Sequence, residues 1–143
     1  MDSARFCTGA HPSPCVCQQT TTEELVRQYL QARNETMQEN ASKGTIEKAL
    51  AYRDDDVVYE HPAAKTRIEG KSTMRMGMSA YLGETKDARY EVQVLATNAS
   101  VLIARIDRSF LAEQDDGSWK PGNRSNITVF EIGDGKIKRI LDY

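Results

Sequence analysis

The sequence lacks the long apolar runs and the excess of basic residues that mark several large classes of protein. No apolar run in the chain approaches the roughly 20 residues that a membrane-spanning helix needs, so no membrane partner is expected. The formal net charge is −2, and without a basic excess to neutralise phosphates a nucleic acid is not an expected partner either. The 143 residues predict a single domain that is long enough to bury a core.

Cysteine is scarce and unevenly placed. All three cysteines lie near the N-terminus, at Cys7, Cys15 and Cys17. Because that stretch also shows little periodicity, we interpret residues 1–20 as a flexible N-terminal arm and residues 21–143 as the folded domain. A metal site that includes His11 is disfavoured, since the spacing is Cys-x-Cys and no second ligand pair follows. With neither a secretory signal nor a disulfide framework indicated, we expect a cytoplasmic protein with reduced thiols.

Apolar residues recur at helical spacing in the first half of the domain. A helix is predicted to begin at one of the three threonines at positions 20–22 and to end near Gly44. Its apolar stripe comprises Leu25, Val26, Tyr29 and Leu30. A second, short helix is predicted over residues 45–52, and a third follows Gly70.

Short alternating segments predict strands in the rest of the domain. The first covers residues 57–61 and is stopped by Pro62, which cannot donate to a sheet. Later strands are predicted at residues 90–96, 101–111, 126–131 and 136–143, with turns rich in Gly, Asn and Asp between them. The three aspartates at 54–56 are interpreted as a solvated turn, because consecutive carboxylates on a turn cannot all converge on one ion. Residues 63–69 are interpreted as a loop.

This order of elements, with helices early and antiparallel strands late, predicts an α+β fold. A sheet of this length twists and curls. We therefore expect a cone-shaped, antiparallel or mixed sheet that is covered on one face by three helices.

Polar side chains stand two residues apart on two of the predicted strands and near the end of a third. They are Tyr59 with His61, Arg105 with Asp107, and Asp142. Side chains two apart on a strand share a face, so the members of each pair point the same way. If these faces line the interior of the curved sheet, one pocket holds a phenol, an imidazole, a guanidinium and carboxylates.

Each of these candidates also has a purely structural interpretation. Arg105 and Asp107 could form a buried ion pair that only stabilises the fold. A lone histidine such as His61 is more often structural than catalytic, although imidazole is the side chain suited to proton transfer near neutral pH. Asp142 could be an exposed carboxylate near the end of the chain, or could point into the pocket together with Ile140.

The motifs that are missing narrow the chemistry. No activated nucleophile, phosphate-binding loop or two-histidine metal pattern is visible, so neither a cofactor nor a metal is expected. What remains is acid–base chemistry. His61 or Asp107 would abstract a proton, and Tyr59 and Arg105 would stabilise the enolate or alkoxide oxygen that forms.

The order of elements and the three polar motifs resemble the NTF2-like superfamily over residues 22–143. Within it, the chain resembles the SnoaL-like polyketide cyclases and the limonene-epoxide-hydrolase group. In that hydrolase group an Asp–Arg–Asp triad works with a tyrosine and an asparagine that hold a water. By position the resemblance assigns the triad to Arg105, Asp107 and Asp142 and the tyrosine to Tyr59, while His61 stands where the asparagine would be.

The histidine at that position favours moving protons over adding water, because histidine can take and return a proton. The pattern is similar to small fungal SnoaL-like enzymes of polyketide pathways, in particular the isomerases that act on tetrahydroxanthones. The resemblance implies epimerisation or ring rearrangement of a polycyclic polyketide in secondary metabolism, without a cofactor, in a homodimer. An epoxide hydrolase and a non-catalytic NTF2-like binding module remain as alternatives.

Overall fold

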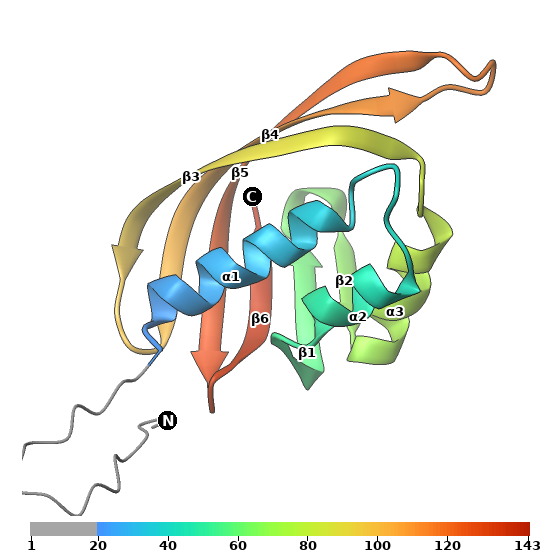
Figure 1. The fold of residues 1–143 in the computed structure, drawn as a ribbon. Coiled ribbons are helices and arrows are strands. Elements are labelled where there is room, and N and C mark those ends of the chain that lie inside the picture. Colours follow the sequence, from blue (N-terminus) through green and yellow to red (C-terminus); the bar gives the residue numbers. More distant parts are fainter. Residues whose placement is uncertain (1–19) are drawn as a thin grey trace, which may run out of the picture.

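The computed structural model describes residues 20–143, which form an α+β arrangement (Figure 1). The elements are α1 (Thr22–Glu35), α2 (Lys43–Leu50), β1 (Arg53–His61), the short 3-10 helix η1 (Pro62–Ala64), β2 (Thr66–Glu69), α3 (Lys71–Ala80), β3 (Thr85–Thr97), β4 (Val101–Glu113), β5 (Trp119–Gly133) and β6 (Lys136–Asp142). The predicted N-terminal arm, with its cysteines and His11, lies outside the described residues except for Thr20.

All six strands form one curved sheet in the order β2-β1-β6-β5-β4-β3. β1 and β6 pair in parallel, and every other neighbouring pair is antiparallel. α1 lies across the sheet, while α2 and α3 lie beside β1 and β2 (Figure 1). The predicted α+β cone, a curved mixed sheet with three helices, is confirmed.

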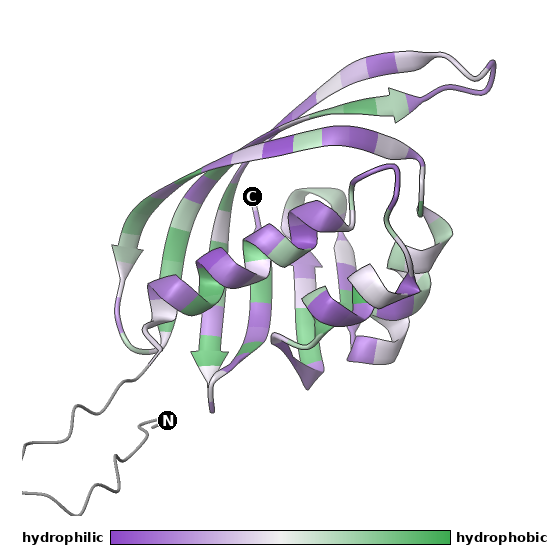
Figure 2. Cartoon of the chain, in the orientation of Figure 1, coloured by the Kyte–Doolittle hydropathy of each residue, from purple (hydrophilic) through white to green (hydrophobic). Residues whose placement is uncertain are grey.

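The core lies between α1 and the inner face of the sheet. The stripe predicted for the first helix is buried and comprises Leu25, Val26, Tyr29 and Leu30. It packs against alternate strand residues such as Leu102 and Phe130. A second cluster, with Ile46, Val57 and Met74, joins α2, β1 and α3. Figure 2 shows hydrophobic and hydrophilic residues alternating along the strands, as expected where one face of a sheet is buried.

The first helical segment differs from the prediction. α1 begins as predicted, because the Thr21 hydroxyl accepts a backbone N–H of the first turn at 3.1 Å. It ends at Glu35, however, and Gly44 lies inside α2 rather than at the end of α1. α2 begins before residue 45 because Ser42 and Thr45 form a reciprocal capping box, which starts a new helix.

Three strand predictions also need correction. Residues 66–69 form β2 rather than part of a loop, and the aspartates 54–56 lie within β1 rather than in a turn. β5 runs through Pro121, although a proline normally interrupts a central strand. It is tolerated here because β6 pairs with β5 only over Thr128–Gly133, which leaves β4 as the one neighbour of β5 near Pro121 in the described chain.

Candidate active site

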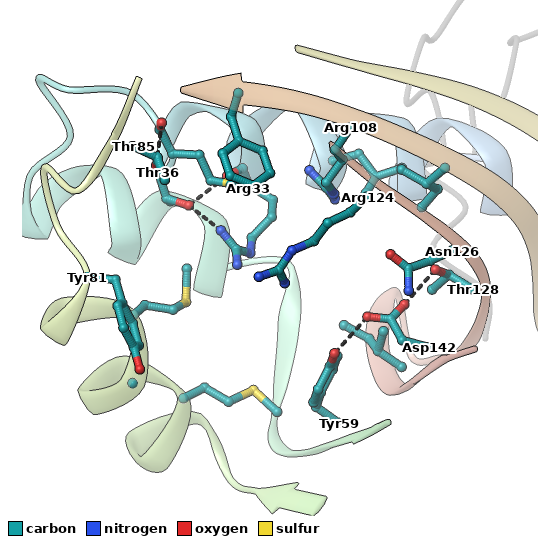
Figure 3. A pocket seen from close by; sticks show the side chains of 18 of the residues that line it. Arg33, Thr36, Tyr59, Tyr81, Thr85, Arg108, Arg124, Asn126, Thr128 and Asp142 are labelled. Carbon is teal, nitrogen blue, oxygen red and sulfur yellow. Dashed lines mark hydrogen bonds between the residues drawn. The ribbon is translucent and has the colours of Figure 1, made fainter. Parts of the chain in front are cut away.

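A cavity of about 750 Å³ lies between α1, α3 and the inner face of the sheet. Its volume is within the range of small-molecule sites, roughly 300 to 1,000 Å³. The apolar part of its lining includes Leu30, Met78, Phe110, Phe130 and Ile140. Polar and charged side chains make up much of the rest of the lining, and Figure 3 labels several of them. A cavity of this kind fits a small organic molecule with a largely apolar body.

Asp142 is held at this cavity by two hydroxyl groups. The Tyr59 O–H donates to Oδ2 of Asp142 over 2.8 Å, and the Thr128 O–H donates to Oδ1 over 2.6 Å (Figure 3). The strand register creates this arrangement, since Tyr59 is level with Ile140 on β6 and Thr128 is opposite Asp142. The sheet therefore fixes the carboxylate while each oxygen keeps a lone pair for another partner.

The Tyr59 hydroxyl acts as a donor to this carboxylate. Burial, followed by the negative charge of Asp142, raises the pKa of Tyr59 above its usual value. The phenol therefore keeps its proton at neutral pH and directs it to Asp142. The two hydrogen bonds orient the carboxylate, and its remaining lone pairs can accept a proton from a bound molecule.

Four arginines line the same cavity, from four elements. They are Arg33 at the end of α1, Arg53 at the start of β1, Arg108 on β4 and Arg124 on β5. Figure 3 labels Arg33, Arg108 and Arg124. Burial lowers the pKa of Arg33 and of Arg108 from the usual arginine value. Within residues 20–143, none of the four has an acidic side chain within 4.0 Å. One carboxylate thus faces several cationic donors without close acidic partners.

His61 lies beside this arrangement rather than within it. It follows Tyr59 on β1, and with Tyr59, Asn126 and Asp142 it lines a second hollow of about 290 Å³. Its Nδ1 accepts the backbone N–H of Ala64 at 3.3 Å, so a neutral ring carries its proton on Nε2. The structure therefore places His61 near the Tyr59–Asp142 pair but outside the lining of the larger cavity.

Arg105 and Asp107 do not line either hollow, which corrects the expectation that they share a pocket with Tyr59. Their side chains are 54% and 44% exposed, and they form an ion pair of 3.2 Å with each other. The Ser125 hydroxyl donates to Asp107, and this bond, followed by Arg105, lowers the pKa of Asp107. The cause is the alternation along β4: Ile106 is buried toward α1, so its two neighbours face the opposite side.

The triad implied by the resemblance to epoxide hydrolases is therefore not assembled from the residues assigned to it. Asp142 and Tyr59 meet in the cavity, whereas Arg105 and Asp107 stand on the outer face of the sheet. The interpretation of that pair as a buried ion pair is wrong as well, because both side chains are about half exposed.

Sequence reasoning overlooked the residues that complete the site. Arg33 lies four positions after Tyr29 and continues the buried stripe of α1, so helical spacing alone predicts that it faces the sheet. Arg108 lies two positions after Ile106 on β4 and shares its face, so it would have been predicted at the cavity if that face had been taken as the inner one. Thr128 could not be found this way, because its contact with Asp142 depends on the register of β5 against β6.

The rest of the described chain adds two findings on binding. No group of three or more His, Cys, Asp or Glu side chains within residues 20–143 is arranged to hold a metal ion. No helix of the same residues is both long and apolar enough to cross a membrane.

Comparison with known proteins identifies the family and the fold. A model of the SnoaL-like domain matches residues 26–140. No curated protein matches the chain. The fold recurs in a SnoaL-like polyketide cyclase from Agrobacterium tumefaciens, with 19% identity, a TM-score of 0.62 and coverage of 87% of this chain and 91% of that one.

Two further solved structures share the fold. An LEH-like epoxide hydrolase from M. tuberculosis has 20% identity and a TM-score of 0.60, with 85% of this chain and 83% of that chain covered. An NTF2-like protein of unknown function from Cytophaga hutchinsonii has 16% identity and a TM-score of 0.60, with coverage of 88% and 91%. At these identities the likeness concerns the fold, and the chemistry has to be argued from the cavity.

Proposed function

The chain belongs to the SnoaL-like domain family, and we propose that it is a cofactor-independent isomerase that moves protons on a polycyclic polyketide. The observation that carries this proposal is the Asp142 carboxylate, which two hydroxyl groups hold at a cavity of mixed apolar and polar lining. In this proposal Asp142 is the general base, and Tyr59 and Thr128 are positioning residues. This differs from the assignment made from the sequence, in which His61 was the principal base.

The proposed step needs neither an oxidant nor water. Asp142 takes a proton from a carbon next to a substrate carbonyl, and the electron pair of that C–H bond moves into an enolate. The enolate oxygen is stabilised by Arg124 and by the Asn126 amide, which line both hollows together with Asp142. The proton then returns from Asp142 to another carbon of the conjugated system, so the product is an isomer of the substrate.

The finer proposal for the substrate is an oxygen-rich polyketide of the tetrahydroxanthone type, in fungal secondary metabolism. The cavity volume of about 750 Å³ and the adaptable side chains of Met74 and Met78 in its lining support a rigid multi-ring substrate. A homodimer and a cytoplasmic location remain predictions from the sequence. Exposed apolar side chains at Ile127 and Tyr143 support a partner surface.

Exchange of a substrate proton with solvent deuterium tests the proposed reaction. The wild-type protein, incubated with a tetrahydroxanthone in D₂O, is expected to exchange the proton next to the carbonyl, observed by NMR. Asp142→Asn is expected to slow this exchange by about 10² to 10⁴-fold, the usual contribution of a general base. A wild-type protein that exchanges no proton, or an Asp142→Asn variant with the full rate, contradicts the proposal, and the first result supports a non-catalytic binding module.

A second candidate is an epoxide hydrolase in which Asp142 activates a water. The observation that favours it is the second hollow of about 290 Å³ beside Asp142, which polar groups of Tyr59, Asn126 and His61 also line. A water held there would lie next to the carboxylate. Labelled oxygen from the solvent separates the two functions, because hydrolysis incorporates it into the product and isomerisation does not.

A further inference from the structure

The cavity holds more positive than negative charge. Arg33, Arg53, Arg108 and Arg124 line it, and Asp142 is the one partly buried acidic group among its lining residues. Glu84 and Glu113 also contribute to the lining, but both are exposed, and neither lies within 4.0 Å of a charged nitrogen of the arginines. Figure 3 shows the guanidinium groups of Arg33, Arg108 and Arg124 on one side of the cavity and Asp142 with Tyr59 on the other.

Arg53 is the most buried of the four arginines; it donates to the Tyr29 hydroxyl and to the Met74 sulfur, and its Nε has no partner among the described residues. Arg33 and Arg108 also lack the acidic partners that buried cations normally have. Arg33 donates to the Thr36 hydroxyl at 2.6 Å, which is a neutral acceptor. Nη1 of Arg108 is buried and has no hydrogen-bond partner among the described residues. The Arg108 guanidinium lies 5.9 Å from the ring centre of Tyr90, a contact that satisfies none of its N–H groups. Burying a charged donor without a partner is costly, and an anion bound between these groups would offset that cost.

We propose that the substrate is an organic anion whose carboxylate binds to Arg33 and Arg108 while its rings lie beside Asp142. The guanidinium fork matches a planar carboxylate and keeps its charge when desolvated, so arginine suits this task better than lysine. The apolar lining from Leu30, Phe110 and Phe130 accommodates the ring system. This inference rests on the proposed function in one respect, namely that the same cavity receives the substrate. It assigns the charge of that substrate and not the reaction.

Paired probes of the same shape test the inference. 2-Naphthoate and 2-naphthamide differ in charge but hardly in size, and the naphthalene fluorescence reports their binding. The wild-type protein is expected to bind 2-naphthoate at least roughly tenfold more tightly than the amide, as a charge-assisted hydrogen bond implies. Equal affinity for the two probes overturns the inference, and this comparison needs no variant.

Variants locate the anion site. Arg33→Gln and Arg108→Gln are each expected to weaken 2-naphthoate by about tenfold while leaving 2-naphthamide nearly unchanged. Arg108→Lys keeps the charge and is expected to keep part of the preference. Arg27→Gln is the matched control, because Arg27 lies on α1 in an exposed ion pair with Glu23. Circular dichroism confirms that each variant is folded. A preference for the carboxylate that survives in both glutamine variants overturns the assignment of the site.

The binding assay and the exchange assay fail independently. Binding of the probes involves no turnover, so equal affinities leave the role of Asp142 as a base standing. Conversely, full exchange activity in Asp142→Asn contradicts the proposed base and leaves the anion site standing.

Discussion

Tyr59 and Asp142 are 83 residues apart in the sequence and are joined by a hydrogen bond of 2.8 Å at the cavity. The parallel pairing of β1 with β6 makes this contact, because it places Tyr59 next to Ile140, two residues before Asp142. The pair links the topology of the sheet to the chemistry proposed for the site, and it gives the first prediction.

Tyr59→Phe is expected to reduce the loss of stability at high pH. Burial and Asp142 raise the pKa of Tyr59 above 10.0, so the folded state holds this proton more tightly than the unfolded state. Its contribution to stability is present below the unfolded pKa and is lost as the pH rises through the folded pKa. Urea unfolding from pH 9 to 12 should therefore show a steeper decline for the wild type. Identical slopes in the two proteins would contradict a protonated phenol at this contact.

His61→Asn decides between two candidate bases. Asparagine can still accept the N–H of Ala64 through its side-chain oxygen, so the variant removes the imidazole while keeping the local turn. Because His61 lies outside the lining of the larger cavity, we expect kcat to fall much less than in Asp142→Asn. An equal loss in both variants would restore His61 as the base.

Asp107→Asn and Arg105→Gln test whether the exposed pair has a role in the reaction. The two side chains face away from the cavity, and exposed ion pairs contribute little, so we expect turnover to stay within about twofold of the wild type. Steady-state rates with the same substrate measure this. Loss of turnover in either variant would mean that the outer face of β4 takes part in catalysis, for example through a partner subunit.

Arg108→Met is expected to stabilise the protein without ligand. The change removes a buried N–H donor that has no partner and keeps an apolar side chain of similar length. An unsatisfied buried polar group costs about 1 to 3 kcal/mol, so we expect the free energy of unfolding to rise by about 1 kcal/mol. Urea unfolding measures the difference, with the exposed Arg89→Met as the control. A variant less stable than the wild type would show that Arg108 serves the fold rather than a ligand.

Much of the fold could be predicted because local patterns specify it. The stripe of α1 has helical spacing, and its burial follows from that spacing alone. β2 was missed because its four residues, Thr66–Glu69, carry no clear alternation and are mostly exposed. The break between α1 and α2 was missed because it depends on the capping of α2 by Ser42 rather than on a change in apolar spacing.

The candidate site was predicted in part. Tyr59 and Asp142 were selected as polar residues on strands, and the structure brings them together. Arg105 and Asp107 were selected by the same rule, but they occupy the outer face. A period of two places Arg105 and Asp107 together on one face without indicating which face is the inner one.

The sequence alone determined most elements of the fold and the pairs of residues that share a strand face, because both follow from the geometry of a few neighbouring residues. Only the tertiary structure decided which face of β4 meets α1, and with it that Arg108 rather than Arg105 enters the cavity. It also decided the contacts of Asp142 with Tyr59 and Thr128, since they come from the register between β6 and its two neighbours. Strand registers join residues that are distant in sequence, so no local pattern specifies them.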